Sequence, residues 1–208
     1  MSQIQAQPQH ASEYHPIGTG IHQLLHQVTD QIDFGLVVCD ADGQMLHANR
    51  SATRELASQR VLKLQDGSVN SAGPGAPELA SAIRAAAQRG RRRLLCLEDD
   101  PPVMLIVLPL DPQAAGERLV LLMIGRRTVC TALGLELLAI QHRLTLAEQR
   151  VLRAIVGGTA SRDIAVENGV AVSTVRTQIQ SLRDKLGVGN IDALLLTAAR
   201  VPPVPSSH

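Results

Sequence analysis

The last quarter of the chain constrains its fold most, because four short helical segments separated by glycines follow one another over residues 144–200. The first segment begins with a capping box, in which Thr145 and Glu148 can each accept a hydrogen bond from the other's backbone N–H. Gly157-Gly158 ends this helix. The later helices are predicted at about 161–168, 173–186 and 191–199. The sequence therefore predicts an all-α, four-helix unit.

The third of these helices is suited to reading a DNA duplex. Val175, Ile179 and Leu182 recur at three- and four-residue steps, so one face should anchor in the unit while the other stays exposed. Two helices joined by a tight glycine turn form a helix-turn-helix, whose second helix enters the major groove. Arginine and glutamine can read base edges there, and further cations can meet phosphates. The candidate DNA-binding residues are Arg162, Ser173, Thr174, Val175, Arg176, Thr177, Gln178, Arg183 and Lys185.

The segment resembles the LuxR/GerE type of helix-turn-helix domain, a four-helix module at the C-terminus of many bacterial transcription regulators. The matching residues cover about a quarter of the chain in order and at the family's spacing. They are Leu144-Thr145, Glu148, Val151-Leu152, Gly158, Ile164-Ala165, Val170, Thr174-Val175-Arg176, Gln178, Lys185-Leu186 and Asn190. The resemblance implies that double-stranded DNA is the partner.

The segment departs from the family pattern where two capping serines usually stand. They are replaced by Ala160 and Ala171, so Ser173 or the backbone is expected to cap the third helix. Each lost cap costs about 1 kcal/mol. Asn168 replaces a usual core leucine, and Ile191 replaces a usual arginine. A degenerate helix-turn-helix that only dimerises or binds a protein partner therefore remains the alternative.

The low net charge of the chain and of its helical segment favours DNA binding by a dimer. The whole chain has a formal net charge of +1, and residues 144–200 carry seven basic and five acidic side chains, a net of only +2. Because a DNA domain needs several phosphate contacts, we expect a homodimer on a palindromic operator. The candidate dimerisation residues, on the apolar segment 128–143 and on the fourth helix, are Leu133, Leu137, Ile140, Ile191, Leu194 and Leu195.

The first half of the chain opens with a hairpin. Residues 35–39 predict a buried strand, Asp42-Gly43 a turn, and residues 45–48 the partner strand. Asn49 then begins a helix, and this Asn-x-x-Ala segment resembles the start of a PAS domain. A turn-rich loop at 66–77 follows, and after it come an alanine-rich helix at 77–89 and strands at about 92–97, 104–109 and 118–124.

Two strands, helices and three strands are the order of a PAS fold, a five-stranded antiparallel sheet with helices. The fold class is therefore α+β for the first domain and all-α for the second. The predicted organisation is a flexible tail at 1–20, a PAS-like sensor at 21–127, a linker and dimerisation helix at 128–143, the helix-turn-helix at 144–200 and a tail at 201–208. A phosphorylated receiver would instead alternate strands with helices.

No cofactor or metal is predicted. A light-sensing flavin PAS needs a cysteine where Asn49 is followed by Arg50, and His47 is the one histidine of the predicted sheet that could ligate haem. His22 and His26 lie one helical turn apart, but two ligands do not make a metal site. An unidentified small effector in the PAS-like domain stays open.

The composition of the chain excludes several further classes of function. The chain has no tryptophan, which disfavours acyl-homoserine-lactone sensing and base stacking on single strands. Three cysteines without a CxxC pair fit a reducing cytoplasm. No apolar stretch approaches the length of a membrane span, and no GxSxG, P-loop, GxGxxG or HExxH motif is present. We therefore expect a cytoplasmic, non-enzymatic regulator without a membrane partner.

Overall fold

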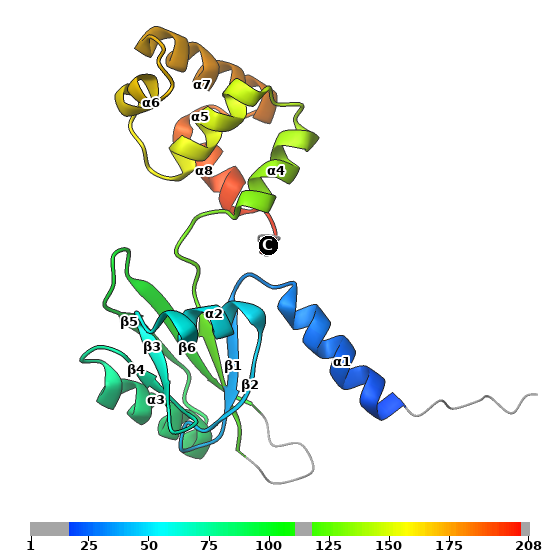
Figure 1. Cartoon of the computed structure of the whole chain (residues 1–208), viewed down its shortest axis with the longest axis vertical. Helices are drawn as coiled ribbons and strands as arrows, with labels where there is room; N and C mark the ends of the chain where they lie inside the picture. Colours follow the sequence, from blue (N-terminus) through cyan, green and yellow to red (C-terminus); the bar gives the residue numbers. More distant parts are fainter. Residues whose placement is uncertain (1–16, 111–117, 205–208) are drawn as a thin grey trace, which may run out of the picture.

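The computed structural model describes residues 17–110 and 118–204, which form an α+β unit followed by a helical unit (Figure 1). The expected tails fall mostly outside the described residues. Where they can be compared, the expected N-terminal tail is too long, because the first helix, α1 (Ile17–Asp30), already includes residues 17–20.

The α+β unit is a PAS-like fold, as predicted. Its sheet has five antiparallel strands in the order β2-β1-β7-β6-β5, with a separate β3-β4 hairpin. The elements after α1 are β1 (Gly35–Cys39), β2 (Met45–Ala48), α2 (Arg50–Ser58), β3 (Leu62–Gln65), β4 (Ser68–Ser71), α3 (Ala76–Arg89), β5 (Arg93–Leu97), β6 (Val103–Pro109) and β7 (Val120–Ile124).

One face of the sheet carries the core of this unit. Val37 on β1 lies opposite Leu122 on β7, and Leu122 lies opposite Val107 on β6. All three side chains are fully buried, and α2 and α3 pack Leu56 and Ala86 into the same cluster. Because successive strand residues alternate between faces, the neighbouring residues point to the uncovered side.

The buried side chain of Asn49 fixes the connection between α1, β1 and α2. Its Oδ1 accepts from the N–H of Ala52 at 2.9 Å, which caps α2 as predicted, and from the N–H of Leu36 at 2.9 Å. Its amide donates to the carbonyls of Thr29 and Phe34. The C-terminal end of α1 is therefore held against the start of α2.

The turn-rich loop expected at 66–77 is wrong in its first part, where β3 and β4 form a hairpin. The strand Ser68–Ser71 has little strand propensity of its own, but Val69 is buried. The N–H of Val69 donates to Gly43 O, and the N–H of Met45 donates to Gly67 O, both at 2.9 Å. Tertiary hydrogen bonds to the β1-β2 turn therefore make a strand where local sequence predicts a loop.

The helical unit contains α5 (Leu146–Val156), α6 (Ser161–Glu167), α7 (Val172–Leu186) and α8 (Ile191–Ala199) at the predicted places. The predicted capping box is present: the N–H of Glu148 donates to Thr145 Oγ1 at 3.3 Å, and that of Thr145 to Glu148 Oε2 at 2.7 Å. Val151 and Leu152, which lie on the inward face of α5, are buried. Leu146 is not, with 72% of its surface exposed, because the first position of α5 points away from the core.

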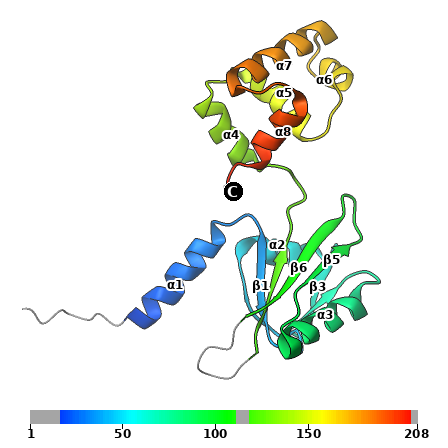
Figure 2. The same cartoon turned by 180° about the vertical axis from the view of Figure 1, so that it is seen from behind.

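The segment expected as a linker helix at 128–143 folds differently. The helix α4 spans only Ala132–Gln141, and Thr131 Oγ1 caps it by accepting from the N–H of Gly134 at 3.1 Å. Leu135 and Ala139 pack into the core that α5 to α8 share. The helix is therefore a fifth helix of this unit (Figure 2). Within residues 17–110 and 118–204, no helix is long and apolar enough to span a membrane.

Candidate nucleic-acid interface

The interface predicted on α7 begins with the turn that joins α6 to α7. Gly169 adopts a φ of +63°, a left-handed conformation that side chains disfavour, and so lets the two helices meet at a sharp angle. Ile164 of α6 and Val175 of α7 are both fully buried in the shared core. Val175, Ile179, Leu182 and Leu186 form the inward stripe of α7.

The opposite face of α7 is polar and open. Ser173, Thr174, Arg176 and Thr177 are exposed, Gln178 is half-buried, and Arg162 is exposed on α6. Within the part of the chain that the structure describes, neither Arg162 nor Arg176 forms an ion pair. Their guanidinium groups are therefore available to a phosphate or a base edge.

Val175 corrects one expectation. It was a candidate for DNA contact, but its side chain is 0% exposed and packs in the core. A buried side chain cannot reach a base edge, so Val175 positions the helix rather than reading DNA.

The first turn of α7 has no side-chain cap. Ala171 is extended, and neither it nor Ser173 supplies a side-chain capping bond, so of the two expected caps Ser173 is ruled out. The first N–H groups of any helix lack intrahelical acceptors. Together with the positive end of the helix dipole, these open N–H groups can bind a phosphate.

The C-terminal half of α7 is held by the carboxylate of Glu148 on α5. Ser181 Oγ donates to Glu148 Oε1 at 2.6 Å, and Lys185 Nζ donates to Glu148 Oε2 at 2.6 Å. Glu148 is only 5% exposed. Burial by itself raises its pKa, but the hydrogen bonds from Lys185, Ser181 and Thr145 outweigh burial and lower the pKa to about 2. The carboxylate is thus charged at neutral pH and links α5 to α7.

Two of the predicted DNA contacts, Lys185 and Arg183, form bonds within the helical unit. Lys185 is bound to Glu148 and to the carbonyl of Arg143, rather than pointing to solvent alone. The guanidinium of Arg183 donates to the carbonyl of Gly189 and, at 3.2 Å, to Gln180 Oε1. Both cations are therefore held by their own unit. The sequence showed Glu148 as half of a capping box, but nothing in it signalled Ser181 or the bond to Lys185.

The candidate dimerisation residues divide into exposed and buried ones. Ile140, Leu137 and Ile191 are 74%, 48% and 40% exposed, whereas Leu133 and Leu195 are half-buried. Leu194 is 0% exposed and belongs to the core. A second copy could not contact it, so its assignment is corrected.

The histidines considered as ligands and the buried cysteine of the α+β unit belong to no metal-binding cluster among the described residues. His47 packs edge-on against His26, with ring centroids 4.3 Å apart. Cys39 is buried, and burial followed by the nearby Asp40 raises its pKa to about 12, so it is an inert thiol. Across residues 17–110 and 118–204, no group of three His, Cys, Asp or Glu side chains could hold a metal ion.

The fold and this site define a class: a PAS-like domain joined to a helix-turn-helix domain whose second helix exposes a polar face. Residues 142–198 match the family model GerE, described as bacterial regulatory proteins of the luxR family. The helical unit is therefore a LuxR-type DNA-binding domain. No curated protein matches the chain.

Several solved structures are similar to this chain at low identity. A phage VqmA in complex with DPO has 18% identity and a TM-score of 0.39, with 89% of this chain and 93% of that chain covered. A Vibrio cholerae VqmA–ligand–DNA complex has 18% identity and a TM-score of 0.39, covering 88% and 90%. The PAS domain of an HTR-like protein from Haloarcula marismortui has 15% identity and a TM-score of 0.35, covering 51% and 97%.

Proposed function

We propose that the protein is a cytoplasmic transcriptional regulator that binds a palindromic operator as a homodimer and is controlled by its PAS-like domain. The observation that carries the proposal is the division of α7 into a buried apolar face and an open polar face within the LuxR-type domain. In this proposal the sensor extends from the start of α1 at Ile17 to about residue 127. The helix α4 belongs, with residues 144–200, to the DNA-binding domain.

The proposed reading residues are those of the open face of α7. Arg176 and Gln178 can make paired hydrogen bonds to guanine and adenine. Ser173, Thr174, Thr177 and Arg162, together with the open N–H groups of the first turn, are placed to meet the backbone of the duplex. Arg183 and Lys185 contribute to the orientation of α7.

Two apolar surfaces support a homodimer. On the helical unit, Ile140, Leu137 and Ile191 are exposed. On the α+β unit, strand register places Leu36, Val38, Leu94, Cys96, Met104, Ile106, Leu121 and Met123 on the uncovered face of the sheet, with no charged side chain among them.

The helix α1 also presents an apolar stripe, at Ile21, Leu24, Leu25 and Val28, which are 46–56% exposed. Because Asn49 holds its C-terminal end, α1 projects from the sheet rather than covering it (Figure 1). A second copy of the chain offers the same stripe and the same sheet face, and so can cover both.

The experiment that tests this function is selection of binding sites from random duplex DNA by the full chain. We expect a two-fold symmetric motif with the wild type. Arg176→Ala should lose the motif, whereas Arg92→Ala, which changes an exposed arginine of the α+β unit, should keep it. Loss of the motif in both variants, or the same motif in all three proteins, would contradict the assignment to α7. If the wild type enriches nothing although it dimerises, the selection is repeated with residues 128–208, which contain the helical core without the PAS-like domain. No enrichment by this fragment either would support the non-DNA-binding alternative.

A further inference from the structure

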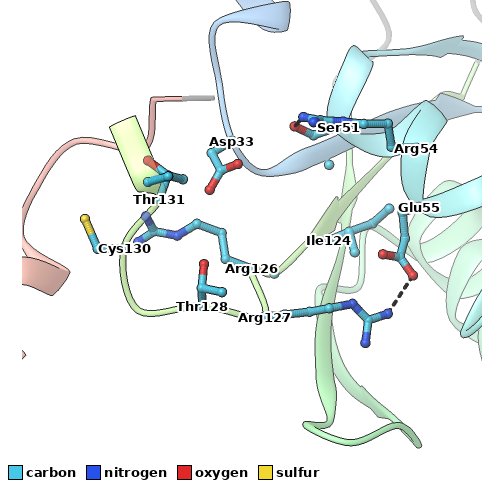
Figure 3. Close-up of a pocket in the computed structure, with 13 residues that line it drawn as sticks. Asp33, Ser51, Arg54, Glu55, Ile124, Arg126, Arg127, Thr128, Cys130 and Thr131 are labelled. Carbon is cyan, nitrogen blue, oxygen red and sulfur yellow. Dashed lines mark hydrogen bonds and ion pairs between the residues drawn. The ribbon is translucent and has the colours of Figure 1, made fainter. Parts of the chain in front are cut away.

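A cavity of about 360 Å³ lies where the α+β unit meets the segment that leads to α4 (Figure 3). Three stretches line it: residues 33–35 before and at the start of β1, the first turns of α2, and residues 124–132. It is distinct from the core between the sheet and α3, and it is the place where sensor and DNA-binding domain join.

The charged side chains of this cavity fall into a paired group and an unpaired group. Arg127 donates to Glu55 Oε1 at 2.8 Å and also to the carboxylate of Asp99. Hydrogen bonds from Arg127 and the backbone of Asp100 lower the pKa of Asp99 to about 2. Asp99 also pairs with Arg60 at 3.0 Å, so that two guanidinium groups balance two carboxylates. The pairs of Arg127 hold the start of the linker on α2 and on the β5-β6 turn.

Asp33, Arg54 and Arg126 form the unpaired group. Among the described residues none of the three forms an ion pair, and the one side-chain hydrogen bond of Arg54 goes to Ser51 Oγ at 3.5 Å rather than to Asp33. Burial raises the pKa of Asp33, against the lowering effect of Arg126 and Arg54. The Arg126 guanidinium lies 5.2 Å from the ring centroid of Phe34. Figure 3 shows Asp33 and Arg126 on one side of the cavity and Arg54 with Ser51 on the other.

These groups specify the chemistry of a ligand. Two guanidinium groups can bind a carboxylate through charge-assisted hydrogen bonds. The carboxylate of Asp33 needs a hydrogen-bond donor, such as an ammonium or a hydroxyl group. The volume is that of about a dozen water molecules and lies in the range of small-molecule pockets. We propose that the cavity binds a small α-amino or α-hydroxy carboxylate, with its carboxylate at Arg126 and Arg54 and its donor group at Asp33.

The position of the site gives the ligand a means of control, and this part rests on the proposed function. The cavity is lined by Cys130 and Thr131, of which Cys130 is buried in the helical core and Thr131 caps α4. The N–H of Asp33 donates to the carbonyl of Pro203, beyond α8, at 3.2 Å. Asp33 and Arg126 both belong to the sensor, but Asp33 is bonded to Pro203 and Arg126 leads into the segment that ends at the Thr131 cap. A ligand that binds best when both connections are in place therefore favours one placement of the DNA-binding domain on the sensor.

Isothermal titration calorimetry of the full chain tests the site without DNA. The probes are the individual L-amino acids and their α-hydroxy analogues, each also as its methyl ester, which removes the carboxylate charge. We expect at least one free acid to bind and its ester not to bind. Arg126→Gln and Asp33→Asn should each weaken binding roughly tenfold or more, and Arg92→Gln should leave it unchanged.

Two outcomes would overturn the proposal: no probe binds the wild type, or the probe that binds does so equally well in Arg126→Gln. If Arg126→Gln does not fold, Arg54→Gln replaces it, because Arg54 is exposed and makes only a 3.5 Å bond to Ser51. Selection of DNA sites with and without the bound acid then tests regulation separately. Binding of the acid with no change in DNA affinity would retain the site and overturn its regulatory role.

Discussion

The helix α7 carries a cation near each end, and the two cations differ in whether their own domain binds them. Near the N-terminus, Arg176 is exposed and forms no ion pair with a described residue, beside a first turn without a side-chain cap. Near the C-terminus, Lys185 is bound at 2.6 Å to Glu148, which also accepts from Ser181. One end of the helix is thus left open for a partner, and the other is fixed to the domain. The comparison teaches that a cation on this helix can be bound by its own domain, so its position on the helix alone does not assign it to DNA.

We expect the largest loss of stability when Glu148, which binds the C-terminal end of α7, loses its charge. Glu148→Gln removes the charge that holds Lys185 and the capping box together. Because a buried carboxylate that accepts from Lys185, Ser181 and Thr145 loses its charge, the free energy of unfolding should fall by about 3 kcal/mol. Urea denaturation of the full chain, followed by circular dichroism, measures it. Glu167→Gln, at an exposed position of α6, is the matched control and should change stability by less than about 0.5 kcal/mol. Equal curves for the two variants would refute the anchoring role.

Acid should act on the same carboxylate. The pKa of Glu148 is lowered from 4.5 to about 2 in the folded chain, so its contribution to stability is present above pH 4.5. It should be lost as the pH falls from 4.5 to 2. Denaturation midpoints measured across this range should converge for wild type and Glu148→Gln. A constant difference between them down to pH 2 would contradict the assigned pKa.

A substitution at the N-terminal end of α7 should change the affinity for DNA and leave the free energy of unfolding unchanged. Arg176→Ala should weaken specific binding by about 1–3 kcal/mol, since it removes paired bonds to a base edge. Fluorescence anisotropy with the selected site measures the loss, and denaturation should superimpose on that of the wild type. A destabilised variant would mean that Arg176 is part of the fold after all.

Lys185→Ala tests whether Lys185 stabilises the domain or contacts a phosphate. It leaves a buried carboxylate with one donor fewer, so stability should fall by about 1–2 kcal/mol. The dependence of DNA affinity on salt should keep its slope, because Lys185 is held by Glu148. A slope smaller by about 1, with unchanged stability, would instead make Lys185 a phosphate contact.

The smallest effect concerns the missing cap. Ala171→Ser restores a capping oxygen at an extended position, with a φ of −70° and a ψ of 149°, and should stabilise the chain by about 1 kcal/mol. The added oxygen competes with a phosphate for the N–H groups of the first turn, so DNA affinity should not rise in parallel. Ala160→Ser, at the same position of α6, is the control that leaves α7 unchanged.

The sequence by itself determined those features that depend on neighbours along the chain. Apolar residues at helical steps, the Thr145–Glu148 box and the glycine turns predicted α5 to α8 closely, and Asp42-Gly43 and Asn49 predicted the first hairpin and the cap of α2. They are local because they involve hydrogen bonds and side-chain periodicity within a few residues. The outward position of Arg176 follows from the same periodicity.

Only the tertiary structure decided the rest. The strand at Ser68–Ser71 depends on bonds to the β1-β2 turn, and the short helix α4 docks on a core built by residues beyond it. The bond between Glu148 and Lys185 joins residues 37 positions apart. The cavity at Asp33 and Arg126 gathers three separate stretches of chain. Such features arise from packing between distant segments, which local propensity and motif spacing do not encode.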